Sequence, residues 1–271
     1  MQMKFIWTLL FFILLMNGVF AQDNGLKNLS DGKTRPLDRN TTLANYTDNS
    51  LSPLELAQGF ELLFNGNNLD GWKLVGPPTT MESGWQVKDG ELHILSTDSS
   101  KNRVHGDIIT MNEYSSFELI FDFKLTAGAN SGIKYFVSLP SPTQRAGLGL
   151  EYQILDDERH PDAKLGLNGN RTLSSLYDIM PASQLDVRFK QNIGQWNHGK
   201  IIVHPNQLVQ HWLNGFKVLE YVKGDAHYLE SIANSKFAKN NEFAKNKITP
   251  ILIQDHGDAV SFKNIKIRKI N

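Results

Sequence analysis

Cysteine is absent from all 271 residues of the chain. This absence excludes disulfide bonds and thiolate metal ligands, so a hydrophobic core has to stabilise the fold without covalent cross-links. The length is sufficient for one such core. A lipid anchor attached to an N-terminal cysteine is excluded for the same reason.

An excess of charge of either sign is also lacking, because 28 Lys and Arg residues balance 28 Asp and Glu residues. Domains that bind nucleic acid usually carry a basic surface, so we expect no nucleic-acid partner. The sequence contains neither a glycine-rich nucleotide loop nor a His-Glu-x-x-His zinc motif. These absences exclude several common enzyme classes.

Long apolar runs are missing except at the N-terminus, where Lys4 precedes an apolar stretch at residues 5–16 and a small-residue segment that ends at Ala21. This order is typical of a cleavable signal peptide. The stretch is shorter than the roughly 20 residues that span a bilayer, which makes an uncleaved anchor the weaker alternative. We therefore predict a signal peptide at residues 1–21 and a mature protein that is periplasmic or secreted, soluble and free of the membrane.

The remaining sequence divides into a polar segment and one folded domain. Residues 22–51 are rich in Asn, Asp, Thr, Ser and Lys and are predicted to be a linker, because they have too little apolar surface to bury. Ser52, Pro53 and Glu55 then form the pattern of a helix start, with a capping box and proline at the first position. We assign residues 52–271 to a single domain.

Short β-type runs separated by turn residues follow this helix and predict an all-β sandwich or barrel. Asn214 and Gly215 between two runs indicate a tight hairpin. One helical insertion is expected at residues 225–239, and its Lys and Asn residues are interpreted as a solvated face. The predicted strands are residues 60–64, 85–87, 91–95, 117–125, 132–138, 151–155, 196–204, 208–213, 217–221, 249–254 and 261–267.

Polar residues at alternate positions of three predicted strands share one face, since side chains alternate along a strand. Ile133, Tyr135 and Val137 are expected to face the core. A single polar residue on such a face is often merely hydrated. The occurrence of several polar residues on one face favours a groove that binds sugar. The residues on the polar face are Asn130, Lys134, Glu151, Gln153, Gln254 and His256.

This set lacks the second acid that ordinary glycoside hydrolysis requires. A retaining glycosidase uses two carboxyl groups about 5 Å apart. Gln153 occupies the same-face position next to Glu151, and an amide is neither a nucleophile nor an acid. Taken alone, His256 is a structural histidine as often as a catalytic one. The residues therefore disfavour two-carboxylate hydrolysis without identifying another reaction.

Eight short motifs in order resemble the 3-keto-disaccharide hydrolase domain family, also described as 3-keto-glucoside 1,2-lyase and 3-keto-2-hydroxy-glucal hydratase. The resemblance covers about residues 54–270. It implies a concanavalin-like or laminin-G-like jelly-roll β-sandwich with a short N-terminal helix and one helical insertion. The motifs are Leu63-Phe64-Asn65-Gly66, Leu69-Asp70-Gly71-Trp72, Trp85-Gln86-Val87-Lys88-Asp89-Gly90, Asn130-Ser131-Gly132-Ile133, Glu151-Tyr152-Gln153-Ile154-Leu155-Asp156, Gln195-Trp196-Asn197, Leu213-Asn214-Gly215 and Gln254-Asp255-His256-Gly257.

The resemblance implies an enzyme that acts on glycosides already oxidised at carbon 3. The ketone acidifies the hydrogen on C2, so a base can form an enolate that expels the group on C1, and water can then add to the glycal. The resemblance assigns His256 as base or proton shuttle, Glu151 as the alternative base or a metal ligand, and Lys134 as the group that stabilises the enolate. The implied substrate-binding residues are Asn130, Gln153, Gln254, Asp156 and Tyr135.

A divalent metal bound by the ketone and its neighbouring hydroxyl would serve the same electrophilic purpose. Glu151, Asp156 and His256 have suitable donor atoms, but no ligand spacing identifies a site, so no cofactor is assigned and the metal requirement stays open. The expected functional partner is a sugar 3-oxidoreductase that supplies the oxidised glycoside. Two alternatives remain, a non-catalytic carbohydrate-binding sandwich and a conventional hydrolase of unoxidised glycan.

Overall fold

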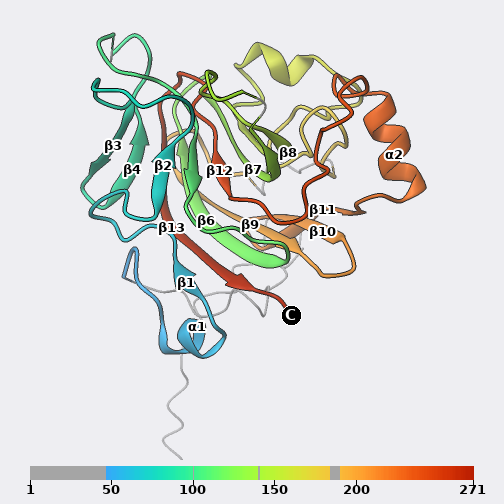
Figure 1. Cartoon of the computed structure of the whole chain (residues 1–271), viewed down its shortest axis with the longest axis horizontal. Coiled ribbons are helices and arrows are strands. Elements are labelled where there is room, and N and C mark those ends of the chain that lie inside the picture. The colour runs from blue at the N-terminus through green and yellow to red at the C-terminus, as the bar shows by residue number, and fades with distance from the viewer. Residues whose placement is uncertain (1–46, 100, 140, 184–189) are drawn as a thin grey trace, which may run out of the picture. The chain divides into compact units, whose positions relative to one another are not determined.

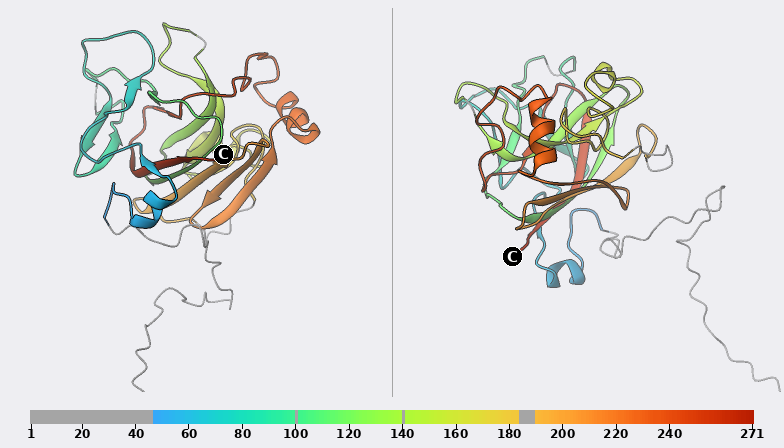
Figure 2. Two further views of the ribbon diagram at one scale, coloured as in Figure 1. Left: turned by 60° about the horizontal axis from the view of Figure 1, so that its bottom comes forward. Right: turned by 90° about the vertical axis from the view of Figure 1, so that its right-hand side faces the viewer.

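The computed structural model describes residues 47–99, 101–139, 141–183 and 190–271 (Figure 1). The predicted signal peptide and most of the predicted linker lie outside these residues. Two antiparallel sheets form the described part, and Figure 2 shows them as separate layers with the longer helix beside the strands. The all-β jelly-roll sandwich predicted from the sequence is confirmed. No helix in the described ranges is long and apolar enough to cross a membrane.

The larger sheet has eight strands in the order β11-β10-β9-β6-β13-β4-β3, with β1 paired to β13. The smaller sheet has the order β2-β5-β12-β7-β8. Strands of the larger sheet are β1 (Glu61–Leu62), β3 (Trp85–Lys88), β4 (Glu91–Ile94), β6 (Phe117–Leu125), β9 (Trp196–Val203), β10 (Leu208–Leu213), β11 (Phe216–Val222) and β13 (Val260–Lys269). Strands of the smaller sheet are β2 (Trp72–Leu74), β5 (Ile108–Thr110), β7 (Asn130–Ser138), β8 (Leu148–Leu155) and β12 (Leu252–Ile253).

The local signals at the hairpin and the first helix act as predicted. Asn214 and Gly215 both have left-handed backbone angles, with φ of 49° and 85°, and connect β10 to β11 in a two-residue turn. Ser52 caps helix α1 (Pro53–Ala57), and the Glu55 carboxylate accepts a hydrogen bond from the Ser52 N–H at 2.7 Å. Both elements are therefore determined by short-range hydrogen bonds and backbone preferences.

The helical insertion is shorter than the sequence indicates. Helix α2 (Ala226–Ala233) begins after the Asp225 cap, whose carboxylate accepts from the Tyr228 N–H at 2.7 Å. A short 3-10 helix, η1 (Pro161–Lys164), lies in another connection. Because α2 ends at Ala233, the residues that follow it are free to turn toward the smaller sheet.

A β-bulge in β7 overturns one assignment of faces. Phe136 has a φ of 52°, and the pairing with β8 shifts between Tyr135 and Ser138. Beyond the bulge, Val137 packs in a small apolar cluster with Leu252 instead of joining Tyr135 in the main core. The prediction that Val137 faces the main core is wrong, because strict alternation fails where a bulge adds a residue.

A buried polar network joins the two sheets in the middle of the core. The Tyr135 hydroxyl lies 2.6 Å from Nε2 of His211 and 2.9 Å from the Tyr221 hydroxyl. Nδ1 of His211 lies 2.9 Å from the Ser174 carbonyl oxygen and donates to it, so Nε2 accepts from Tyr135. Burial lowers the pKa of His211 to about 4, which keeps the ring neutral.

Replacement of Tyr135 by Phe is expected to lower the free energy of unfolding by about 1–3 kcal/mol, because buried His211 loses its hydrogen-bond donor. Denaturant unfolding measures the change. Tyr114→Phe is the control. The Tyr114 hydroxyl donates to Glu61 at 3.0 Å, and this hydrogen bond is only partly buried. Equal losses in the two variants would contradict a special role for the core network.

Candidate active site

A small cavity of about 160 Å³ lies against β7 and β8, on the face of the smaller sheet opposite the main core. A cavity of about 150 Å³ holds a benzene ring in another protein, so this one has room for a single six-membered sugar ring. Six of the eight predicted site residues line it. The lining residues are Asn130, Lys134, Leu148, Gly149, Glu151, Gln153, Tyr177, Lys236, Phe237, Gln254 and His256.

Strand register brings the predicted residues together. Lys134 on β7 lies opposite Glu151 on β8, and Gly132 lies opposite Gln153. The chain beyond β12 continues alongside β7, because the Gln254 N–H donates to the Gly132 carbonyl oxygen at 2.9 Å. The three segments that the sequence assigned to one polar face therefore converge on one cavity.

The polar face is covered rather than solvated. Lys134 is 7% exposed and Glu151 is 5% exposed, so the interpretation that such residues are merely hydrated is wrong for this pair. The loop at residues 173–180 pairs along the outer edge of β8, with hydrogen bonds from the Ser174 N–H to the Gln153 carbonyl at 2.8 Å and from the Tyr177 N–H to the Glu151 carbonyl at 3.0 Å. Tyr177, Lys236 and Phe237 form the cover and enclose the cavity against the sheet.

Lys134 lies between two buried acids. Its Nζ atom is 3.8 Å from Glu151 and 4.0 Å from Asp107, and it donates to the Gly147 carbonyl oxygen at 3.1 Å. With the Gln254 amide turned so that its nitrogen faces Glu151, the amide donates to Glu151 at 3.3 Å and accepts from Lys134 at 3.2 Å. The ammonium and the amide thus fix the Glu151 carboxylate in one orientation.

Burial raises the pKa of Glu151, and the nearby cations Lys134, Lys236 and His256 oppose this effect without reversing it. Burial also raises the pKa of Asp107, although Lys134 pulls it down. A carboxylate with a raised pKa in a cavity is a better base at neutral pH than an ordinary one. The raised pKa of Glu151 is one property that a general base requires.

Gly132 provides the space that the Glu151 carboxylate occupies. A Cβ atom at position 132 would lie 2.1 Å from Oε1 of Glu151, well inside any permitted contact. The requirement is steric, because the backbone of Gly132 is ordinary strand. The glycine in the Asn-Ser-Gly-Ile motif therefore has a defined structural purpose at this site.

Five of the cavity residues are not predicted from the sequence, and two of these, Tyr177 and Lys236, have side chains with polar groups. Nζ of Lys236 lies 4.0 Å above the ring of Tyr177, whose hydroxyl donates to Asp162 at 2.7 Å. Desolvation lowers the pKa of Lys236, although the residue still reaches solvent. Lys236 was interpreted as part of a solvated helix, and no periodic pattern marks Tyr177, so only the fold reveals them.

Two predicted substrate-binding residues lie outside the cavity. Tyr135 points into the core, where its hydroxyl bonds to His211. Asp156 ends β8 and holds the following turn, accepting from the Gly128 N–H at 2.8 Å and from Arg159 at 3.2 Å. The structure therefore removes both from the candidate site, because strand alternation buries the first and turn formation occupies the second.

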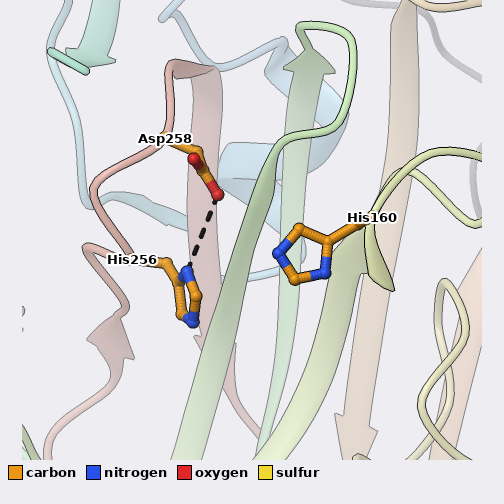
Figure 3. Close-up of side chains that lie close together, drawn as sticks. All are labelled: His160, His256 and Asp258. Carbon is orange, nitrogen blue, oxygen red and sulfur yellow. Dashed lines mark ion pairs between the residues drawn. The ribbon is translucent and has the colours of Figure 1, made fainter. Parts of the chain in front are cut away.

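The metal ligands considered from the sequence do not come together either. Among the described residues, one group of His, Asp or Glu side chains is compact enough to hold an ion, and it consists of His160, His256 and Asp258 (Figure 3). Glu151 and Asp156 are not members of this group. His256 is the member of this group that also lines the cavity.

Comparisons with known proteins identify relatives of this chain. A family model described as a 3-keto-alpha-glucoside-1,2-lyase-like domain matches residues 59–268. A 3-keto-disaccharide hydrolase of Bacteroides thetaiotaomicron is 31% identical over 236 residues, which cover 79% of this chain and 80% of the relative.

Two solved structures from Parabacteroides distasonis, both candidate glycosyl hydrolases, are also similar. The first is 30% identical with a TM-score of 0.71, covering 83% of this chain and 100% of its own. The second is 25% identical with a TM-score of 0.58, covering 78% of this chain and 99% of its own. The similarity includes nearly the whole described domain.

Replacement of Gly132 by Ala is expected to cost about 1–3 kcal/mol of unfolding free energy, because the new methyl group overlaps the Glu151 carboxylate. In the background of Glu151→Ala the same change should cost much less. A double-mutant cycle by denaturant unfolding measures this coupling. Additive costs would show that the carboxylate does not occupy the space beside Gly132.

Replacement of Glu151 by Gln should change the pH dependence of stability. Because the folded-state pKa is raised, the folded protein holds the proton more tightly than the unfolded chain, and the wild type loses stability as pH rises from the usual 4.5 through the raised value. The Gln variant lacks this loss, so its stability relative to the wild type should increase over that range.

Thermal unfolding at a series of pH values measures the difference. Glu230→Gln, on the exposed side of α2, is the matched control and should give a difference that does not vary in this way. A parallel pH dependence in wild type and Glu151→Gln would contradict the raised pKa.

Proposed function

The chain belongs to the family of 3-keto-alpha-glucoside-1,2-lyase-like domains, and from this premise we propose that it cleaves glycosides oxidised at carbon 3 by elimination of the C1 substituent. The family and its relatives support an enzyme that acts on sugars. The elimination chemistry is the part of the proposal that the cavity has to support.

One observation carries the proposal, which is that Glu151 is the one acid among the described residues that line the cavity. Hydrolysis by paired carboxylates needs a second acid about 5–10 Å away on the other side of the scissile bond. Elimination next to a ketone needs one base, a group that stabilises the enolate and a proton donor for the leaving oxygen. The cavity residues fit the requirements of elimination and not those of hydrolysis by paired carboxylates.

In this proposal Glu151 removes the proton from C2, and the C–H electrons move into the enolate of the C3 ketone. Lys134 lies 3.8 Å from Glu151 and supplies positive charge beside the site where the enolate forms. The enolate then expels the C1 substituent, leaving a double bond between C1 and C2. Addition of water across this bond gives the free 3-keto sugar and completes net hydrolysis.

Lys236 is the proposed proton donor to the departing oxygen. It lies at the rim of the cavity above Tyr177, and its lowered pKa makes the ammonium a stronger acid than an ordinary lysine. A proton from Lys236 would neutralise the alkoxide as the C1–O bond breaks. His256 also lines the cavity, and 46% of its side chain is exposed.

The cavity size and amides define the expected substrate recognition. The space fits one oxidised ring, so the leaving group extends toward the open side. Asn130, Gln153 and Gln254 present amide groups to this space and are proposed to hydrogen-bond the ring hydroxyls. Such contacts select a sugar over an apolar molecule of the same size.

The predicted export signal fits this function, because a sugar 3-oxidoreductase has to supply the substrate in the same compartment. The signal peptide at residues 1–21 stays a prediction, since these residues are outside the described part of the chain. We propose that both enzymes act outside the cytoplasm on the same glycosides.

The reaction run in heavy water tests the elimination directly. Removal of the C2 proton and its return from solvent should leave one deuterium in the released 3-keto sugar, detected by mass spectrometry, whereas simple hydrolysis leaves none on carbon. Glu151→Gln should slow turnover of a 3-keto-glucoside about 10²- to 10⁴-fold, because it removes the base but keeps the shape.

Unoxidised nitrophenyl glucoside serves as the substrate control, and Tyr135→Phe serves as the variant control, since Tyr135 lies outside the cavity. Cleavage of the unoxidised glycoside would favour a conventional hydrolase. Tight binding of sugars without turnover of any 3-keto-glycoside would favour a carbohydrate-binding module. Release of ketosugar without deuterium would refute the elimination.

A further inference from the structure

We propose that His160, His256 and Asp258 form a binding site for one divalent metal ion at the mouth of the cavity. His160 comes from the connection after β8, whereas His256 and Asp258 lie between β12 and β13. Figure 3 shows the three side chains directed toward a common space. The site therefore joins two segments that are about a hundred residues apart in sequence.

The spacing of the donor atoms fits a metal after a small adjustment. All three ligand atoms lie within 4.8 Å of one another. Ligands about 2.1 Å from the same ion lie closer together than this limit, so the side chains have to draw together when an ion binds. His256 is free to make this movement, because 46% of its side chain is exposed.

His256 and Asp258 lie close together without a hydrogen bond between them. Nδ1 of His256 lies 3.6 Å from Oδ2 of Asp258, which is too long for a hydrogen bond. Neighbouring ligands on a tetrahedral or octahedral ion are about 3.0–3.4 Å apart. The rings of His160 and His256 meet edge to face, with their centroids 5.7 Å apart.

A second observation points to the same place. Oδ1 of Asn130 is buried without a hydrogen-bond partner among the described residues, and Asn130 lines the cavity together with His256. The Asn130 N–H donates to Oδ2 of Asp258 at 3.0 Å, which links the amide residue to the metal ligand and orients its carboxylate. This unsatisfied oxygen lies in the cavity that His256 lines, where it is available to a bound ligand or to water on an ion.

The donor set indicates the class of metal. Two imidazoles with one carboxylate suit zinc, manganese or ferrous iron better than calcium, which prefers oxygen ligands alone. Since three protein side chains leave coordination positions open, a bound ion could also contact substrate. The site therefore resembles a catalytic centre more than a closed structural one.

His160 has to change its tautomer when the ion binds. Its Nδ1 atom accepts from the Asp162 N–H at 3.2 Å, so the neutral ring carries its proton on Nε2, the nitrogen that faces the cluster (Figure 3). Coordination through Nε2 moves the proton to Nδ1 and breaks this long hydrogen bond. The loss is small beside a metal–nitrogen bond, and it provides a spectroscopic signature.

The purpose of the ion rests on the proposed function, whereas its binding does not. An ion at the mouth could contact the C3 ketone and the neighbouring hydroxyl of an oxidised sugar and polarise the carbonyl. His256 would then serve as a ligand, while Glu151 deeper in the cavity remains the base. This division explains why the cavity contains a buried carboxylate and a more exposed histidine together.

Titration of the purified full chain with Mn²⁺, followed by electron paramagnetic resonance, tests the site without any substrate. We expect one bound ion per chain and at least tenfold weaker binding in His160→Gln and in Asp258→Asn. His227→Gln, an exposed histidine on α2, is the matched control and should bind like the wild type. Titration with Zn²⁺, followed by nitrogen NMR of the histidine rings, should move the His160 proton from Nε2 to Nδ1.

Failure to bind either Mn²⁺ or Zn²⁺, or equal binding in all three variants, would overturn the proposal. Each variant is checked by thermal unfolding, so a loss of binding with an unchanged unfolding temperature supports the site. Metal binding without turnover of a 3-keto-glucoside would sustain the site and refute the proposed function. Turnover at the full rate by metal-free protein that binds no ion would refute the metal site and sustain the proposed function.

Discussion

The pairing of β7 with β8 is the constraint on which the candidate site depends. It places Lys134 opposite Glu151, and the cover above the sheet removes both charges from water. Burial of a charged pair is costly unless other polar groups complete it, and here the Gly147 carbonyl and the Gln254 amide do so. Gly132 leaves the space without which this arrangement could not form.

The two sides of β7 carry different kinds of residue, with the stabilising core network on one side and the candidate site on the other. On the core side of β7, Tyr135 joins neutral His211 in a network that is fully enclosed. On the other side, Lys134 and Glu151 keep an opening toward the rim. Alternation along a strand thus assigns neighbouring residues to opposite tasks, and the bulge at Phe136 ends that alternation beyond the site.

The rim is formed by segments without regular structure. Tyr177 is positioned by a backbone hydrogen bond to β8, and Lys236 follows α2 where that helix ends early. His256 and Asp258 occupy the turn before β13. Loops held on a rigid sheet commonly carry binding residues, because their side chains are free to converge from distant parts of the chain. The proposed base lies on a strand, while the proposed acid and metal ligands lie on such loops.

The sequence by itself determined the β-sandwich, the capped first helix, the hairpin at Asn214 and the polar face that contains Glu151, because each depends on local periodicity or on hydrogen bonds between near neighbours. The short strands β2 and β5 are not predicted from the sequence, because three residues are too few to show a periodic pattern. Only the tertiary structure decided that the polar face is buried, that Lys236 and Tyr177 cover it, and that His160 meets His256. These facts depend on contacts between residues far apart in the chain, which no local pattern encodes.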